Sequence, residues 1–433
     1  MIVASIESIF LTIALIIFAG FIGSVIFKRT RVSDLMLLML IGVIVGPVLN
    51  LVNLGNSILQ TVAPFFAALV LMMLMFESGL KLNFFKVILE LKEAFAFTVI
   101  VFIAGCIGTA AIMYFLGWPL IYGIILGAII GDISNAVVIP LLQRLKTREE
   151  TKIMLSLESA ITDVLCVVVA ISFIQIALNP NALDIQKIGQ DIAGAFGIAI
   201  VLGLLFAVFW LTLLRDIKSV KETEYVLTIG VLFTLFFLAE YLHSNGTIAA
   251  FVFGLILGNS REIMGFLRMK PITIDGNISL FQTEISFFLT TFFFIYLGLT
   301  LELARIDFFV FFLSLFLSIM LLLVRFGITK AMCRFFKNEK EDYRIIATMM
   351  PRGLTAAVLA AYPLAMGLQE NFVLQIAQIV FLVILLSNII TTIGVVWNER
   401  KGRAEKKEQK DSELEEIKIP TAAEKKPKAV SRA

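Results

Sequence analysis

Long apolar stretches, separated by short polar or charged connections, run through almost the whole chain. An α-helix needs about 20 apolar residues to cross the hydrocarbon core of a bilayer, and most of these stretches reach that length. Stretches bounded by charged residues, Gly, Pro or Asn predict thirteen membrane-spanning helices. Their ranges are 5–27, 33–49, 59–80, 94–116, 119–142, 153–178, 189–214, 223–242, 246–258, 279–300, 308–331, 343–366 and 372–397. The pattern therefore predicts an all-α polytopic membrane protein.

The composition agrees with this interpretation. Of the 433 residues, 59% are hydrophobic and 16% are charged, whereas a soluble domain is about half apolar and about a quarter charged. The three cysteines lie inside apolar stretches and there is a single histidine, so no disulfide framework, Cys/His metal site or cofactor is expected. The chain is not an ordinary soluble enzyme, and we expect the lipid bilayer, not nucleic acid, as the partner of its surface.

Lys and Arg alternate strongly between successive connections. The six odd-numbered connections carry 21 of these residues, and the six even-numbered ones carry only two. Positive residues stay on the cytoplasmic side, so the amino terminus is predicted outside a cell membrane and the carboxyl terminus inside. An even number of spans would break this alternation.

The end of the chain, 399–433, has a different composition. It holds 11 Lys or Arg and eight Asp or Glu, with few apolar residues. Such a segment cannot bury enough apolar surface to fold alone. We expect a transmembrane domain over 1–398, followed by a charged and disordered cytoplasmic tail.

Glycine motifs recur in the two halves of the chain. The GVIVG of 42–46 closes helix 2 as the GLILG of 254–258 closes helix 9, and small residues four apart let helices approach closely. Helix 3 ends in SGLKL (78–82) and helix 10 in LGLTL (297–301). An offset of seven helices reverses the second copy, which predicts inverted six-helix repeats. The repeats are 5–178 and 223–397, with the helix 189–214 between them.

Six ionisable side chains stand deep inside predicted spans, where a charge costs at least about 2.5 kcal/mol. They are Glu77, Asp132, Glu158, Asp163, Arg325 and Arg352. In helix 5, Asp132 follows Gly131 in a run of weak helix formers. In helix 12, Pro351 precedes Arg352 and removes a backbone donor. Interruptions in matching helices of two repeats predict discontinuous helices that cross near the membrane midplane and form a binding site.

Helix 6 combines carboxylates with hydroxyl groups. Ser159 and Asp163 are four residues apart and share a face, and Glu158 and Thr162 form the adjacent stripe. Oxygen ligands of this kind suit a small cation, and burial disfavours the charged form of a carboxyl group. A buried carboxylate here can hold either a proton or a metal cation.

The buried arginines need anionic partners or a route to water. Arg352 cannot give up its proton, and Glu158 is its predicted partner, which leaves Asp163 for ion binding. Arg325 lies about a turn from the cytoplasmic end of helix 11, where we expect its long side chain to reach the interface.

Five motifs, taken together and in order, resemble the monovalent cation:proton antiporter superfamily, on the side of NhaP-type and eukaryotic sodium/proton exchangers. They are LMFESGLKL, IGDISNAVV, LESAITD, SNGTIAAFVFGLILGN and PRGLTAAV. The resemblance implies a secondary transporter, not an enzyme, that exchanges Na⁺, or else Li⁺ or K⁺, for H⁺. It further implies a homodimer in which a mobile six-helix core carries the ion past a scaffold domain by an elevator-like movement.

The resemblance also assigns roles to single residues. Asp163 is similar to the family's ion- and proton-carrying aspartate, and Ser159 to its neighbouring ligand. Asp132 resembles the aspartate at the helix 5 crossing, which ligates the ion through water or orients the site, with the Gly131 carbonyl nearby. The expected metal ligands, for the transported cation, are thus Asp163, Ser159 and Asp132.

Further positions follow the family less closely. Glu77 resembles a helix 3 glutamate that reaches the ion in some members, and Glu158 and Arg352 match a structural ion pair. Thr162 precedes Asp163 where the family usually has Asn or a second Asp. With one carboxylate at this pair, one proton competes with one cation, which predicts electroneutral exchange.

Three other functions stay open. The two membrane aspartates could form the dyad of an intramembrane protease, but Gly-x-Gly-Asp is absent at Asp132. A channel is disfavoured because the sequence contains no TVGYG filter, and a potassium efflux system is disfavoured because no GxGxxG domain follows the last helix. An organic-anion transporter is disfavoured because buried acids outnumber buried bases.

Overall fold

The computed structural model of the chain describes residues 34–48, 58–82, 92–134, 137–138, 141–142, 147–178, 185–216, 224–266, 276–299, 307–335, 342–368 and 371–417, with a few positions between 14 and 25. All regular structure in these residues is helical, and six of the helices are long and apolar enough to cross a membrane. The first predicted span, 5–27, lies mostly outside the described residues, so the count of thirteen stays a prediction.

Most of the helices coincide with the predicted stretches. They are α2 (Asp34–Val43), the π-helical turn η1 (Ile44–Val48), α3 (Ile58–Lys81), α5 (Lys92–Phe115), α6 (Leu120–Ile129), α8 (Glu149–Leu178), α9 (Ile185–Asp216), α10 (Glu224–Tyr241), α11 (Gly246–Gly258), α12 (Ser260–Phe266), α13 (Gly276–Leu299), α14 (Phe308–Phe335), α15 (Tyr343–Thr348), α16 (Leu354–Ala365) and α17 (Asn371–Ile417). The agreement follows from the length and apolarity of the stretches, which leave the backbone no alternative to helix in lipid.

Two predicted spans are broken near their middle, as expected. The span 119–142 leaves the helix after Ile129, passes through a non-helical segment at 132–134, and is helical again at 137–138. The span 343–366 consists of α15 and α16 with the non-helical residues 349–353 between them. Proline disfavours helix in the residue before it, and the Gly-Asp-Ile-Ser run is a weak helix former, so both breaks lie where the local sequence resists helix.

Helices from opposite repeats meet at the glycine motifs. A Cβ on Gly254 or Gly258 of α11 would collide with the backbone of α3, and one on Gly79 of α3 would lie 2.7 Å from the amide nitrogen of Leu255. A Cβ on Gly42 of α2 would likewise lie 2.9 Å from the Cα of Gly298 in α13. α2 of the first predicted repeat packs on α13 of the second, and α11 of the second packs on α3 of the first. This reciprocal pairing is what inverted repeats require.

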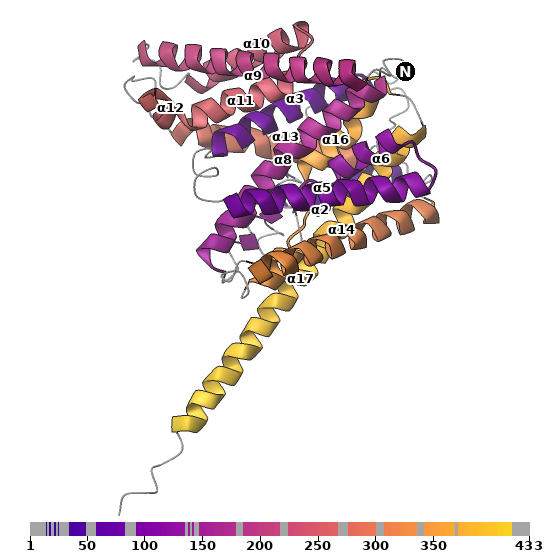
Figure 1. Ribbon diagram of the computed structural model, residues 1–433, viewed down its shortest axis with the longest axis vertical. Helices are drawn as coiled ribbons and strands as arrows, with labels where there is room; N and C mark the ends of the chain where they lie inside the picture. The colour runs from indigo at the N-terminus through magenta and orange to yellow at the C-terminus, as the bar shows by residue number, and fades with distance from the viewer. Residues whose placement is uncertain are drawn as a thin grey trace, which may run out of the picture.

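The helices form two groups. In one, α3 packs on α11, α11 on α9 and α10, and α2 on α13; in the other, α5, α6, α8, α14, α15, α16 and α17 pack on one another. Figure 1 shows α9 and α10 along one side of the molecule and α5 and α14 along the other, with α8 and α16 between them. Contacts of α3 with α8 and α16 join the groups next to both broken spans.

The tail differs from its prediction. α17 continues without a break to Ile417 and leaves the bundle as a single long helix (Figure 1). The residues from 399 to 417 are therefore helical, and 418–433 lie outside the described residues. The difference has a local cause, since this stretch consists largely of Glu, Lys and Arg, which are good helix formers, and it extends a helix that is already nucleated.

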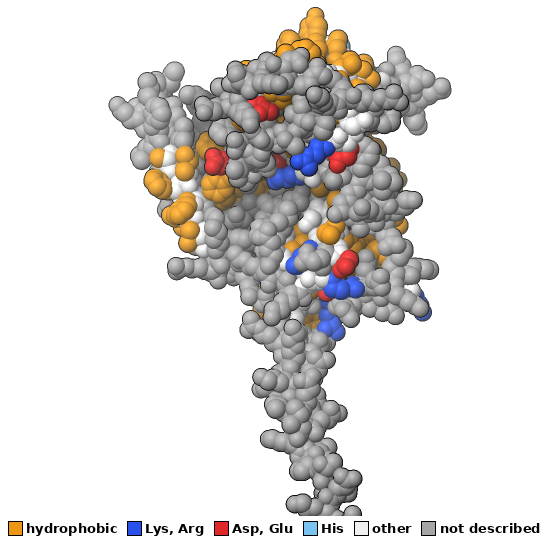
Figure 2. Space-filling view, turned by 90° about the vertical axis from the view of Figure 1, so that its left-hand side faces the viewer, with side chains coloured by type: hydrophobic (Ala, Val, Ile, Leu, Met, Phe, Trp, Pro, Cys, Tyr) orange, Lys and Arg blue, Asp and Glu red, His pale blue; other side chains and the backbone are white. Residues whose placement is uncertain are grey.

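Large apolar side chains are exposed along the outer helices. On α14 they include Phe309, Phe312, Phe316 and Leu323, and other such residues lie on α9 and α10. Figure 2 shows one face on which hydrophobic side chains gather at two edges and charged ones lie between these edges. Such extensive apolar exposure fits a surface in contact with lipid.

The glycine contacts make a direct prediction. We expect Gly254→Ala to lower the melting temperature of the purified protein by the equivalent of about 1–3 kcal/mol, the usual cost of overpacking a tight interface. Gly230→Ala in α10 is the matched control, because a Cβ there meets nothing within 4 Å and removes a helix-interior glycine. Equal melting temperatures for the two variants would contradict the close approach of α3 and α11.

Candidate functional site

The two non-helical segments cross each other in the middle of the molecule. The amide of Ser134 donates to the carbonyl of Pro351 at 2.8 Å. Gly353 lies so close to the Ser134 side chain that a Cβ at this position would collide with its hydroxyl. The crossing thus depends on a residue without a side chain in the second broken span.

Asp132 lies at the amino end of α16. Its Oδ2 accepts from the amide of Gly353 at 3.2 Å and from that of Ala356 at 3.4 Å. A helix amino terminus carries partial positive charge, so it stabilises this buried carboxylate. The other oxygen, Oδ1, is buried and accepts no hydrogen bond from the part of the chain that the structure describes. That oxygen is therefore suited to bind a cation or a proton.

Arg352 binds the opposite end of the crossing. Its Nη1 donates to the carbonyl of Gly131 at 3.0 Å and to that of Asp132, where the α6 half of the broken span has ended. Its own backbone is fixed by Ser387 and Asn388 of α17, at 3.1 and 2.9 Å. The guanidinium neutralises the partial negative charge of carbonyls that lack a helical partner. The Gly131 carbonyl, predicted to lie near the ion, thus already accepts from Arg352.

Asp163 lies on α8 beside the crossing and is 7% exposed. Its Oδ1 accepts from the Thr355 hydroxyl of α16 at 2.7 Å, and its Oδ2 accepts from Ser78 of α3 at 3.4 Å. Asp163 and Asp132 thus both contact the first turn of α16, Asp163 through the Thr355 hydroxyl and Asp132 through the amides of Gly353 and Ala356. The two aspartates that the sequence predicted to form the site are brought together, each from a different span.

The predicted hydroxyl ligands are close by but are engaged with backbone. Thr162 accepts from the amide of Ile133 at 3.2 Å and donates to the carbonyl of Ser159, so it fixes the segment that carries Asp132. Ser159 donates to the carbonyl of Ser156 at 3.0 Å. A hydroxyl that donates still has oxygen lone pairs, so both could ligate a cation.

The predicted pairing of Glu158 with Arg352 is wrong. Glu158 is fully buried and forms a two-pronged ion pair with Arg325 of α14, with Nη2 and Oε2 2.8 Å apart. Arg325 is 2% exposed, does not reach the interface as expected, and also donates to Ile346 at 2.7 Å. Its guanidinium lies 5.5 Å from the Phe97 ring. Since planar, two-pronged geometry matches a carboxylate, Arg325 is the better partner for this glutamate.

Glu77 faces a different partner from the one expected at an ion site. It is 9% exposed and forms an ion pair with Lys81, one turn later on α3. Its neighbour Ser78 contacts Asp163. The predicted reach of Glu77 to the ion stays a prediction.

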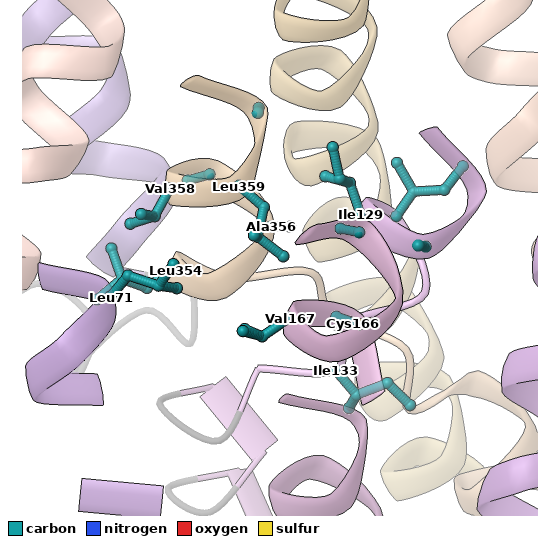
Figure 3. Close-up of a cluster of buried hydrophobic side chains, with 14 of the residues drawn as sticks. Leu71, Ile129, Ile133, Cys166, Val167, Leu354, Ala356, Val358 and Leu359 are labelled. Carbon is teal, nitrogen blue, oxygen red and sulfur yellow. The ribbon is translucent and has the colours of Figure 1, made fainter. Parts of the chain in front are cut away.

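Apolar side chains surround the crossing. Figure 3 shows Ile129 and Ile133 of the first broken span, Leu354 and Ala356 of the second, and Val167 of α8 packed about it. These residues are 6% exposed or less. Charges in such surroundings interact more strongly than in water, so each must be matched by a partner or by a bound ion.

Sequence reasoning missed two residues that contact Asp163. Ser78 and Thr355 both lie in the quoted motifs, FESGLKL and PRGLTAAV, yet hydroxyls are common in membrane helices and carried no separate signal. It also missed Asp342, which precedes α15 and accepts from Thr151 at 2.7 Å and from the Arg148 amide at 3.2 Å. This contact ties the beginnings of α8 and α15 together, and only the folded chain brings them near.

The comparison with known families decides the identity. The model of the family described as sodium/hydrogen exchanger, transmembrane, matches residues 13–398. The chain belongs to this sodium/hydrogen exchanger family. Exchangers of this family move a monovalent cation against protons, which agrees with a buried carboxylate site inside a multi-pass membrane protein.

Solved structures of an exchanger share the fold. The sodium proton antiporter MjNhaP1 from Methanocaldococcus jannaschii at pH 8 matches with a TM-score of 0.72 and 21% identity, over 89% of this chain and 99% of that one. An electron-microscopy structure of the same antiporter matches with a TM-score of 0.68 and 20% identity, over 98% of this chain and 100% of that one. At these identities the likeness shows the antiporter fold and not the residues that bind the ion.

The corrected ion pair can be tested by a double-mutant cycle. We expect Arg325→Met to destabilise this exchanger by about 3–5 kcal/mol, because it leaves the Glu158 carboxylate buried without its guanidinium. Adding Glu158→Leu to that variant should restore part of the loss, since no buried charge remains. Melting temperatures in detergent give the comparison. If Glu158→Leu restored stability to the Arg352→Met variant and not to the Arg325→Met variant, the assigned pairing would be contradicted.

Proposed function

We propose that this exchanger moves one monovalent cation, Na⁺ first and otherwise Li⁺ or K⁺, against one proton, with both competing for Asp163. The observation that carries the proposal is the pair of buried carboxylates at the crossing, with Oδ1 of Asp132 accepting no hydrogen bond from the described residues. Hydroxyls from two further helices point at Asp163. Hard oxygen atoms of this kind suit a small cation.

A count of charges supports the one-to-one ratio. Around the crossing, the described residues include three buried carboxylates, Asp132, Glu158 and Asp163, and two buried guanidinium groups, Arg325 and Arg352. The formal sum is one negative charge, which one proton or one monovalent cation neutralises. Because a net charge in low dielectric is costly, the loaded site is the form that can be carried across the membrane.

The helix groups supply a route for alternating access. We assign the group with α5, α6, α8 and α14–α17 to a mobile core and the group with α2, α3, α9–α11 and α13 to a scaffold that forms the contact of a homodimer. The core carries Asp163, so a sliding movement of this group would expose the ion to each side in turn. The alternation of basic connections favours a cell membrane with the tail of α17 in the cytoplasm.

The Asp163→Asn variant tests whether Asp163 is the residue that carries the ion and the proton. We expect this variant to fold, because an amide can still accept from Thr355, and to lose exchange by at least about a hundredfold, because an amide binds no proton at neutral pH. Proton flux in proteoliposomes gives the rate and size-exclusion chromatography the fold. Ser172→Ala on the same helix is the matched control, because within the part of the chain that the structure describes its hydroxyl donates to the carbonyl of Val168, one turn earlier on α8. Full exchange by the Asp163 variant would refute the carrier assignment.

The ratio of cations to protons and the identity of the transported cation are tested on the unaltered protein. We expect Na⁺ to drive proton movement in sealed proteoliposomes at the same rate with and without an imposed membrane potential, because one charge replaces one charge. Once the pH is low enough for protons to occupy Asp163, the Na⁺ concentration for half-maximal rate should rise about tenfold for each unit by which the pH falls, as simple competition requires. The same measurements are made in parallel with Li⁺ and with K⁺ in place of Na⁺. A rate that follows the potential would contradict the one-to-one ratio.

A further inference from the structure

The carboxylate of Asp163 is contacted by two hydroxyls from different helix groups. Thr355 belongs to α16, in the same group as α8, and donates to Oδ1 at 2.7 Å. Ser78 belongs to α3, in the other group, and donates to Oδ2 at 3.4 Å. The first distance is that of an ordinary hydrogen bond, and the second is long. The contact between the groups is therefore the longer of the two, and its strength depends on the charge of the carboxylate.

The helix that carries Ser78 is fixed in its own group. Next to Ser78, Gly79 lies against the backbone of α11 so closely that a Cβ would stand 2.7 Å from the Leu255 amide. Gly254 and Gly258 of α11 approach α3 in the same way. Backbones packed at this distance cannot slide without separating. Ser78 must therefore stay with the scaffold while Asp163 moves with the core.

The second repeat has no counterpart of this hydroxyl. The motif position that corresponds to Ser78 is Leu297 of α13, which is buried and apolar. Ser78 is itself only 8% exposed, and its hydroxyl donates to Asp163. Packing alone would be satisfied by an apolar residue at this position, as in α13.

Building on the proposed exchange, we propose that Ser78 is a positioning residue that holds the ionised, unloaded Asp163 to the scaffold and so prevents the empty core from crossing. A hydroxyl binds a charged carboxylate more strongly than a neutral one. A bound proton or cation neutralises the carboxylate and weakens the contact, which releases the core. Movement is then tied to loading, the condition for exchange without leak.

Ser78→Ala tests this role in proteoliposomes that contain the full chain. We measure ²²Na⁺ and proton fluxes together at a pH where protons are scarce, with the potential set by K⁺ and valinomycin. We expect sodium movement that responds to the potential to rise about tenfold, and the number of protons moved per sodium ion to fall below one. Ser78→Thr keeps the hydroxyl and should restore coupling, whereas Ser172→Ala should leave it intact.

The outcomes separate this inference from the function on which it rests. If the unaltered protein moves no protons against any cation, the proposed function fails. If it exchanges normally and Ser78→Ala stays fully coupled, the inference fails. A higher Na⁺ concentration for half-maximal rate with unchanged coupling would make Ser78 a ligand and overturn its role as a holding contact. Equal leak in the Ser78→Thr variant would show that packing, not the hydroxyl, matters, and would also overturn it.

Discussion

The structure depends on one constraint: inside a bilayer no water is present to satisfy a charge or an unpaired backbone group. Breaking two helices in the middle of the molecule exposes carbonyls at the end of α6 and amides at the beginning of α16. Arg352 binds the carbonyls and Asp132 accepts from the amides, so each half-helix meets a charge that opposes its dipole. The break is stable because the crossing contains both charges, and neither would be tolerated without the break.

Two kinds of helix packing surround this crossing. Between α3 and α11, and between α2 and α13, glycines bring backbones into direct contact, and such interfaces hold a fixed geometry. Around α8 and α16, larger side chains such as Val167 and Leu354 fill the contacts. Close glycine contacts occur within the second group as well, since a Cβ on Gly127 of α6 would lie 2.8 Å from the Cys106 carbonyl oxygen of α5. The contact of the Ser78 hydroxyl with Asp163 lies at the boundary between the two groups.

Much of the fold could be predicted because lipid leaves few alternatives. Apolar length located the helices, and Gly131 and Pro351 located both breaks. The partner of Glu158 could not be predicted in this way, because a buried carboxylate can pair with any nearby arginine. Arg325 and Arg352 were equally plausible by charge, and only the packing of α14 on α5 and α15 brings the former to Glu158. Ser78 and Thr355 escaped for the same reason, since a hydroxyl gains a role from its neighbour and not from its position in a motif.

The helix ends at the crossing also bear on how an ion is selected. In many transporters with broken helices, freed carbonyls and helix termini meet the ion directly. Here the carbonyls of Gly131 and Asp132 accept from Arg352, and the amides of α16 donate to Asp132. If Asp163 binds the ion as proposed, discrimination among cations falls largely on side-chain oxygens around Asp163, which single substitutions can alter without disturbing the backbone. A site built in this way can change its preferred ion while the charged frame of Glu158, Arg325 and Arg352 stays the same.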